Sequence, residues 1–62
     1  MTLVRIGDAA EITGLRESQI RSRIRRGDIP HVRFGPRLVL FERDALVSWV
    51  REHRVATHAD GR

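Results

Sequence analysis

The sequence contains, close to its start, the stretch Asp8-Ala9-Ala10-Glu11-Ile12-Thr13-Gly14-Leu15. Asp8 can cap the first turn of a short helix, and Gly14 can take the left-handed conformation that ends it. Where one helix crosses the next closely, a small residue is favoured at the contact, a glycine at the turn, and apolar residues just after it and five positions further on. These requirements are met by Ala10, Gly14, Leu15 and Ile20. The stretch therefore predicts a helix-turn-helix.

The second helix is predicted to run from Arg16 to Arg26, and Gly27 and Pro30 end it. Ile20 and Ile24 lie four residues apart, so they share one face of this helix. The opposite face carries Ser18, Ser22 and Arg25.

Two short extended stretches follow, His31–Phe34 and Arg37–Phe41, and Gly35-Pro36 between them predicts a β-hairpin. With a two-residue loop, Val32 pairs with Val39. The face expected to cover the core then carries Val32, Phe34, Val39 and Phe41. The outer face carries His31, Arg33, Leu38 and Leu40.

A last helix is predicted from Glu42 or Arg43 to His53, and its apolar stripe consists of Leu46, Trp49 and Val50. Glu42 and Asp44 lie near its start, where the helix dipole favours negative charge. Residues 54–62 show no apolar period and are expected to form a flexible tail. The sequence thus predicts a small, mainly helical α+β domain over residues 1–53, a winged helix-turn-helix with a two-stranded hairpin as the wing.

The length and composition exclude several classes of protein. The chain has 62 residues and no cysteine, which excludes a disulfide framework and a thiolate metal site. No apolar run approaches the roughly 18 residues of a membrane span, and no secretory signal is apparent, so we expect a cytoplasmic protein that does not bind a membrane. His53, His58 and Asp60 straddle the expected helix end without a rigid arrangement, so we expect neither metal nor cofactor. With no nucleophile–base pair, an enzyme is not expected.

All 12 basic residues are arginine, against 8 acidic residues, which gives a net charge of +4 and an isoelectric point near 11.5. A strongly basic small domain indicates a polyanionic partner, here double-stranded DNA. Two explanations of the arginine bias remain open: GC-rich codon usage, and selection for bidentate contacts to phosphate and guanine.

The run from Ile6 to Val50 resembles the small excisionase and AlpA-like prophage regulators of the MerR-type winged-helix superfamily. Besides the stretch quoted first, the resemblance is carried by Gly27-Asp28-Ile29-Pro30, Arg33-Phe34-Gly35-Pro36-Arg37-Leu38-Val39-Leu40-Phe41 and Ala45-Leu46-Val47-Ser48-Trp49-Val50. It implies that the second helix enters the major groove and that the wing contacts the neighbouring backbone or minor groove. The family usually has apolar residues where this chain has Thr13 and Arg23.

The helix face and the wing give the candidate DNA contacts. On the second helix these are Arg16, Ser18, Gln19, Arg21, Ser22, Arg25 and Arg26, of which Gln19 and Arg21 can contact base edges and the other arginines suit phosphates. Arg33 and Arg37 flank the wing tip. The alternatives are a solvated charged helix face and a hairpin edge protected from aggregation by charge.

These observations favour a sequence-specific DNA-binding protein, and within that class an excisionase that directs an integrase toward excision. A small prophage-type transcriptional regulator is the alternative. A protein-interaction adaptor is a third, in which the outer hairpin residues Leu38 and Leu40 contact an integrase, a polymerase or another copy. We further expect the protein to be monomeric when free and to bind DNA cooperatively, with copies touching through Leu38 and Leu40.

Overall fold

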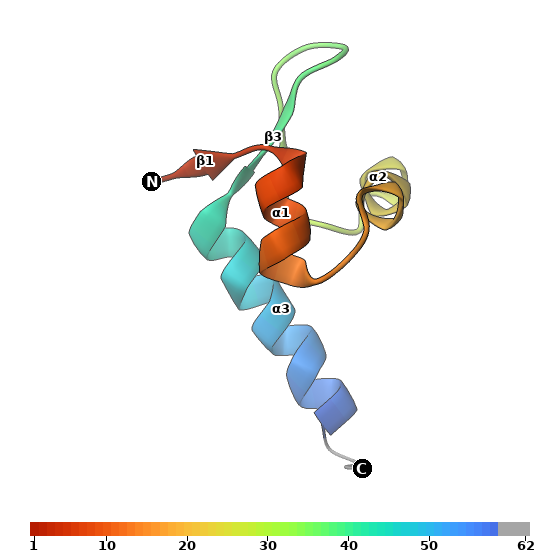
Figure 1. The fold of residues 1–62 in the computed structure, drawn as a ribbon, viewed down its shortest axis with the longest axis vertical. Helices are drawn as coiled ribbons and strands as arrows, with labels where there is room; N and C mark the ends of the chain where they lie inside the picture. The colour runs from red at the N-terminus through yellow and green to blue at the C-terminus, as the bar shows by residue number, and fades with distance from the viewer. Residues whose placement is uncertain (59–62) are drawn as a thin grey trace.

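The computed structural model describes the backbone of residues 1–58 and the side chains of residues 1–53. Its elements are β1 (Leu3–Val4), α1 (Ile6–Thr13), α2 (Glu17–Arg26), β2 (Val32–Arg33), β3 (Val39–Glu42) and α3 (Arg43–His58). Figure 1 shows α1 beside α3, with α2 and the β2–β3 hairpin projecting from them in different directions. Three helices and a three-stranded antiparallel sheet in this order form a winged helix-turn-helix, as the sequence predicted.

The turn between α1 and α2 forms as expected. Gly14 adopts a left-handed conformation with φ of 77°, and its N–H donates to the carbonyl of Ala10 at 2.8 Å. The Thr13 hydroxyl donates to the Ala9 carbonyl at 2.8 Å and accepts from the Leu15 N–H at 3.2 Å. The hydroxyl therefore links the last helical turn of α1 to the connection between α1 and α2.

The start of α1 differs from the prediction. The helix begins at Ile6, with Arg5 in an extended conformation before it and no side-chain cap, so Asp8 lies inside the first turn and does not cap it. The reason is strand β1, which the sequence analysis missed. Leu3 and Val4 pair with Glu42 and Phe41 of β3, and the chain enters α1 directly after that pairing. Asp8 still lies where the helix dipole favours a negative charge.

The register of the wing also differs from the prediction. Val32 lies opposite Leu40 and Arg33 opposite Val39, and the Phe34 N–H donates to the Leu38 carbonyl at 2.8 Å. The loop therefore has three residues, 35–37, instead of two. A shift of one residue in register moves the side chains of one strand to the other face. Val32 and Phe34 accordingly leave the predicted core face, and their exposed fractions are 38% and 53%.

Helix α3 begins where it was predicted, at Arg43. The Glu42 carboxylate accepts from the Asp44 and Ala45 N–H groups at 3.3 and 2.9 Å, which caps the helix. The helix continues to His58, five residues beyond the predicted end, so the first part of the expected tail is helical. The rest of that tail, residues 59–62, lies outside the described residues.

The core lies where α1, α2, β3 and α3 meet. Its buried residues are Ala9, Ile20, Ile29, Phe41 and Leu46. Partly buried residues from every helix and from strands β1 and β3 pack against this cluster, among them Trp49 and Val39. The core thus fixes α2 through Ile20 and, through Phe41, strand β3 of the wing. Within residues 1–58, no helix is long and apolar enough to cross a membrane.

Candidate nucleic-acid interface

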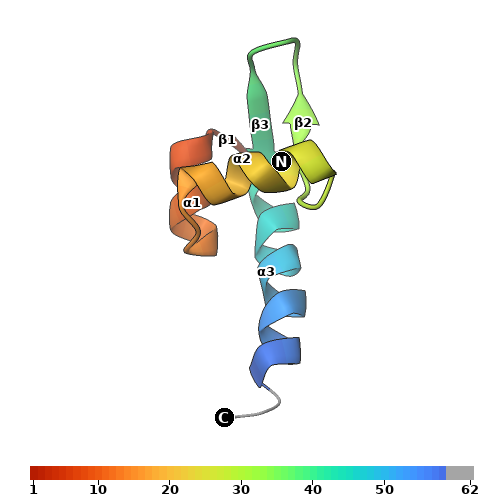
Figure 2. The same cartoon turned by 90° about the vertical axis from the view of Figure 1, so that its right-hand side faces the viewer.

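Helix α2 presents one long face to solvent. Figure 2 shows it running across the molecule, with the β2–β3 hairpin on one side and α3 extending away on the other. Ile20 is completely buried and Ile24 half-buried, which orients the helix as the sequence predicted. Of the seven candidate residues on this helix, Ser22 is half-buried. The exposed ones are Arg16, Ser18, Gln19, Arg21, Arg25 and Arg26.

Gln19 has a structural role besides its candidate role in base contact. Its Oε1 accepts a hydrogen bond from the backbone N–H of Arg16 at 2.9 Å and so stabilises the start of α2. The reciprocal bond of a capping box cannot form, because an arginine side chain has no acceptor. The amide group of Gln19 keeps its two N–H donors for a ligand.

Two arginines of the helix face have weak partners on α2 itself. Arg21 lies 3.5 Å from Glu17, one turn earlier, and both side chains are about half exposed. Arg25 donates to the Ser22 hydroxyl at 3.2 Å. Exposed pairs of this kind contribute little to stability, so both guanidinium groups can exchange these partners for DNA.

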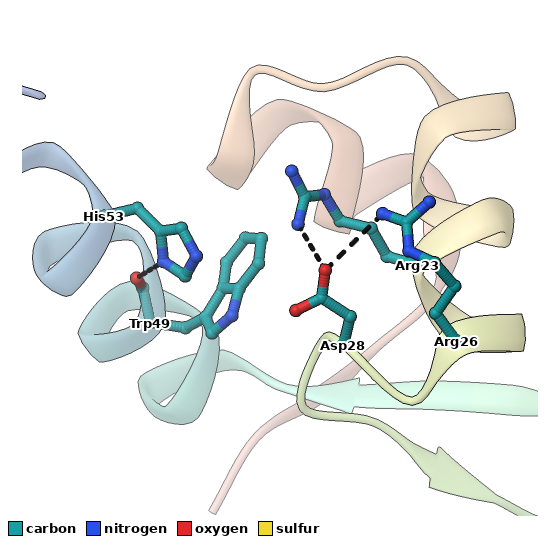
Figure 3. A network of polar contacts seen from close by, with 5 residues as sticks. All are labelled: Arg23, Arg26, Asp28, Trp49 and His53. Carbon is teal, nitrogen blue, oxygen red and sulfur yellow. Dashed lines mark hydrogen bonds and ion pairs between the residues drawn. The ribbon is translucent and has the colours of Figure 1, made fainter.

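The end of α2 is built around Asp28. Gly27 is left-handed with φ of 69°, the Asp28 N–H donates to the Arg23 carbonyl at 2.8 Å, and the two together form a Schellman motif. Figure 3 shows the Asp28 carboxylate between Arg23 and Arg26, at 2.8 and 3.5 Å. The Arg23 guanidinium also lies 5.4 Å from the centre of the Trp49 ring. The sequence analysis did not predict this network.

The wing carries Arg33 on β2 and Arg37 in the loop, both exposed. No ion pair within the described part of the chain engages either of them, or Arg16 at the start of α2. Gly35, with φ of 118°, allows the sharp turn between the two wing arginines. The structure brings these arginines to the tip of the hairpin, on a different element from the α2 residues.

Positive charge is concentrated in the segment that forms α2 and the wing. Residues 16–41 contain seven of the twelve arginines and two of the eight acidic residues, a net charge of +5. The remainder contains five arginines and six acidic residues, a net charge of −1. The field of the protein therefore attracts a polyanion to α2 and the wing in preference to α1 and α3.

The outer face of the sheet is apolar, which the sequence analysis recognised only in part. Alternation along the paired strands places Leu3, Val32, Phe34, Leu38 and Leu40 on this face. Leu38 is 37% exposed and Leu40 half-buried, as an outer position requires, whereas Val32 and Phe34 join them through the three-residue loop. Pairing the strands with a three-residue loop would have placed Val32 and Phe34 on this face, but the sequence fits a two-residue loop equally well.

Metal-binding side chains are not grouped in the described part of the chain. No three histidine or acidic residues there lie close enough to hold a metal ion. The side chain of His58 and all of Asp60, which the sequence analysis weighed as ligands, lie outside the described residues.

The turn geometry, the exposed basic helix and the projecting hairpin define a DNA-binding protein of the winged helix-turn-helix class. The chain belongs to the helix-turn-helix domain family, whose model matches residues 3–54. Neither the curated proteins nor the solved structures contain a significant match to it. DNA is therefore its partner.

Proposed function

We propose that the protein is an excisionase of a phage or mobile element, which binds DNA through α2 in the major groove and through the wing on the adjacent backbone or minor groove. The observation that carries this placement is the exposed face of α2, which carries Arg25 opposite the buried Ile20 and Arg21 on its flank. A helix that served only to cover the core would not need so many arginines on its free face.

The two elements have different roles in the proposed complex. Gln19 and Arg21 contact base edges, because amide and guanidinium groups match the donor and acceptor pattern of the major groove. The other candidates, Arg16, Ser18, Ser22, Arg25 and Arg26 on α2 and Arg33 and Arg37 on the wing, contact phosphates or allow close approach. Such contacts position the protein without recognising sequence.

A single module of this size covers little DNA. Comparable modules bury about 600–1,000 Å² of protein surface on DNA, which is small for tight specific binding. We propose that neighbouring copies bind cooperatively, each touching the next through the outer sheet face that contains Leu38 and Leu40. This outer sheet face has far fewer residues than the roughly 20–30 that each partner contributes to a stable interface, so the free protein is monomeric. Shared DNA then supplies the effective concentration for contact.

One experiment distinguishes the excisionase from the two alternatives, a transcriptional regulator and a protein-interaction adaptor. The gene is deleted from cells that carry its element, and both the excised DNA junction and the transcripts of neighbouring genes are measured. Loss of excision with transcription unchanged supports the excisionase. Altered transcription with normal excision favours a small transcriptional regulator. If a variant altered at Leu38 loses excision but, against the proposal, still binds DNA cooperatively, that result favours an adaptor that contacts the integrase.

A further inference from the structure

The network at the end of α2 contains two arginines that share one acceptor. Arg23 Nη1 and Arg26 Nη2 both donate to Oδ2 of Asp28, at 2.8 and 3.5 Å (Figure 3). The backbone of Asp28 does not depend on these contacts, because its N–H is held by the Arg23 carbonyl. The end of the helix therefore places a carboxylate beside the basic face of α2.

The two arginines are held very differently. Arg23 is 28% exposed, makes the shorter bond and lies over the Trp49 ring, so it is fixed on two sides. Arg26 is 61% exposed, and its long contact of 3.5 Å to Asp28 is its only ion pair within the described residues. Exposed pairs of this geometry are weak, whereas a guanidinium bonds phosphate oxygens strongly. Arg26 is thus the member that can leave.

We propose that Asp28 competes with DNA phosphate for Arg26 and thereby lowers the affinity of the protein for DNA of any sequence. This inference rests on the proposed placement of α2 against DNA. In free protein Arg26 is paired with Asp28, and in the wild-type complex it remains shared between Asp28 and a phosphate, so that its phosphate contact is only partly formed. Arg23 stays on Asp28 and Trp49 throughout and keeps the orientation of the helix end.

The competition acts on the part of binding that carries no sequence information. Phosphate contacts set the salt dependence of affinity and contribute alike on a target site and on arbitrary duplex. Asp28 therefore limits how long the protein remains on DNA without altering which bases it prefers. The same carboxylate that stabilises Arg23 for helix orientation also restrains Arg26.

The test is Asp28→Asn, which removes the charge and keeps an oxygen acceptor for Arg23. Affinity for target and for random duplex is measured by fluorescence anisotropy at several salt concentrations. We expect tighter binding to both, and a log-log salt slope steeper by up to about 0.9, the value for one complete phosphate contact. A fourfold rise in salt then weakens binding by the variant up to about 3.5-fold more than binding by the wild type. Should this variant unfold, Asp28→Ser provides the same comparison.

The control is the same change in an Arg26→Ala background, where the slope should change by less than half as much. Glu17→Gln is the matched variant, because it removes one negative charge from the other end of α2 and leaves the Asp28 pair intact. The change that Glu17→Gln causes in the salt slope should be the same whether residue 26 is arginine or alanine. Emission of Trp49, the only tryptophan, should be unchanged in Asp28→Asn, which shows that Arg23 has stayed in place.

Three results would overturn the inference: an unchanged slope in Asp28→Asn, an equal steepening with and without Arg26, or an effect confined to the target site. The last would mean that Asp28 contacts bases. Failure of the proposed function has a different signature, since Arg21→Ala and Arg25→Ala would then leave DNA binding unaltered.

Discussion

Gln19 Oε1 and the backbone N–H of Arg16 form a 2.9 Å hydrogen bond across the first turn of α2. The same side chain therefore stabilises the helix and, in our proposal, contacts a base. Alanine at this position removes both functions at once, whereas glutamate keeps the acceptor and removes only the amide donors.

We expect Gln19→Ala to lower the free energy of unfolding by about 1 kcal/mol, the usual value for a lost cap. For a domain of this size that lowers Tm by roughly 4–8 °C. Gln19→Glu should melt like the wild type, because a glutamate in the first turn is also favoured by the dipole. Both variants should lose discrimination between target and random duplex, measured as a ratio of affinities. If Gln19→Glu retains the wild-type ratio, Gln19 is a cap alone.

Arg21 is expected to contribute to sequence recognition. Its pair with Glu17 is long and exposed, so the guanidinium is free to contact a base edge. Arg21→Ala should reduce discrimination between target and random duplex by about 1–3 kcal/mol. Competition binding with both duplexes at one salt concentration measures this. An equal loss on the two duplexes would assign Arg21 to the phosphate backbone.

Arg37, in the wing loop, is expected to contribute affinity without recognition. No described side chain forms an ion pair with it. Arg37→Ala should weaken binding to target and random duplex by the same factor and make the log-log salt slope shallower by about 0.9. Arg51, exposed on α3, provides the control, since Arg51→Ala should leave the slope unchanged. If Arg37→Ala altered base preference while Arg21→Ala did not, the roles of helix and wing would be reversed.

Gly14 is expected to be required for its backbone conformation. Its φ of 77° strains any residue with a Cβ, although a Cβ added there would meet no atom within 4 Å beyond the adjacent residues of the chain. Gly14→Ala should destabilise the fold by about 1–2 kcal/mol. Gly7→Ala is the matched control. Gly7 lies in α1 with an ordinary φ, and its added Cβ would meet only Glu17 Oε2, at 3.9 Å, so we expect up to about 1 kcal/mol of stabilisation. Thermal unfolding of both variants measures the difference.

The C-terminal ends of α1 and α2 could be predicted from the sequence because Gly14 and Gly27 are needed for left-handed turns, which few other residues adopt. The faces of α2 followed from the spacing of Ile20 and Ile24. The register of the wing could not be predicted, because Gly35-Pro36 fits a loop of two residues as well as one of three. That single residue decides whether Val32 and Phe34 face the core or the solvent.

The partners of the arginines were equally inaccessible to sequence reasoning. The environment of Arg23 depends on the approach of Trp49 from α3, 26 residues further along the chain. The pairing of Arg26 with Asp28 depends on the path of the chain through the Schellman turn. Periodicity identifies which residues share a face, but the contacts between elements come from tertiary packing.

The last prediction concerns the apolar outer face of the sheet. Within the described residues, the exposed large apolar side chains are Met1, Leu3, Val32, Phe34 and Leu38, and all but Met1 lie on this face. Such clustering is typical of a contact surface. We propose that it contacts a neighbouring copy on DNA, and Phe34 and Leu38 near the wing tip are the most suitable residues for a test. Leu40 is half-buried, so its replacement risks unfolding the hairpin.

The double variant Phe34→Ser and Leu38→Ser should bind DNA with one site as the wild type does and lose cooperativity on DNA with several adjacent sites. Both changes replace partly exposed apolar groups, so Tm should fall only slightly, and sedimentation should show a monomer for variant and wild type alike. Binding isotherms on the two DNAs, compared at the same salt concentration, separate contact between copies from contact with DNA. Unchanged cooperativity would place the contact between copies elsewhere. A loss of single-site affinity in a folded variant would instead show that this end of the wing packs against the DNA itself.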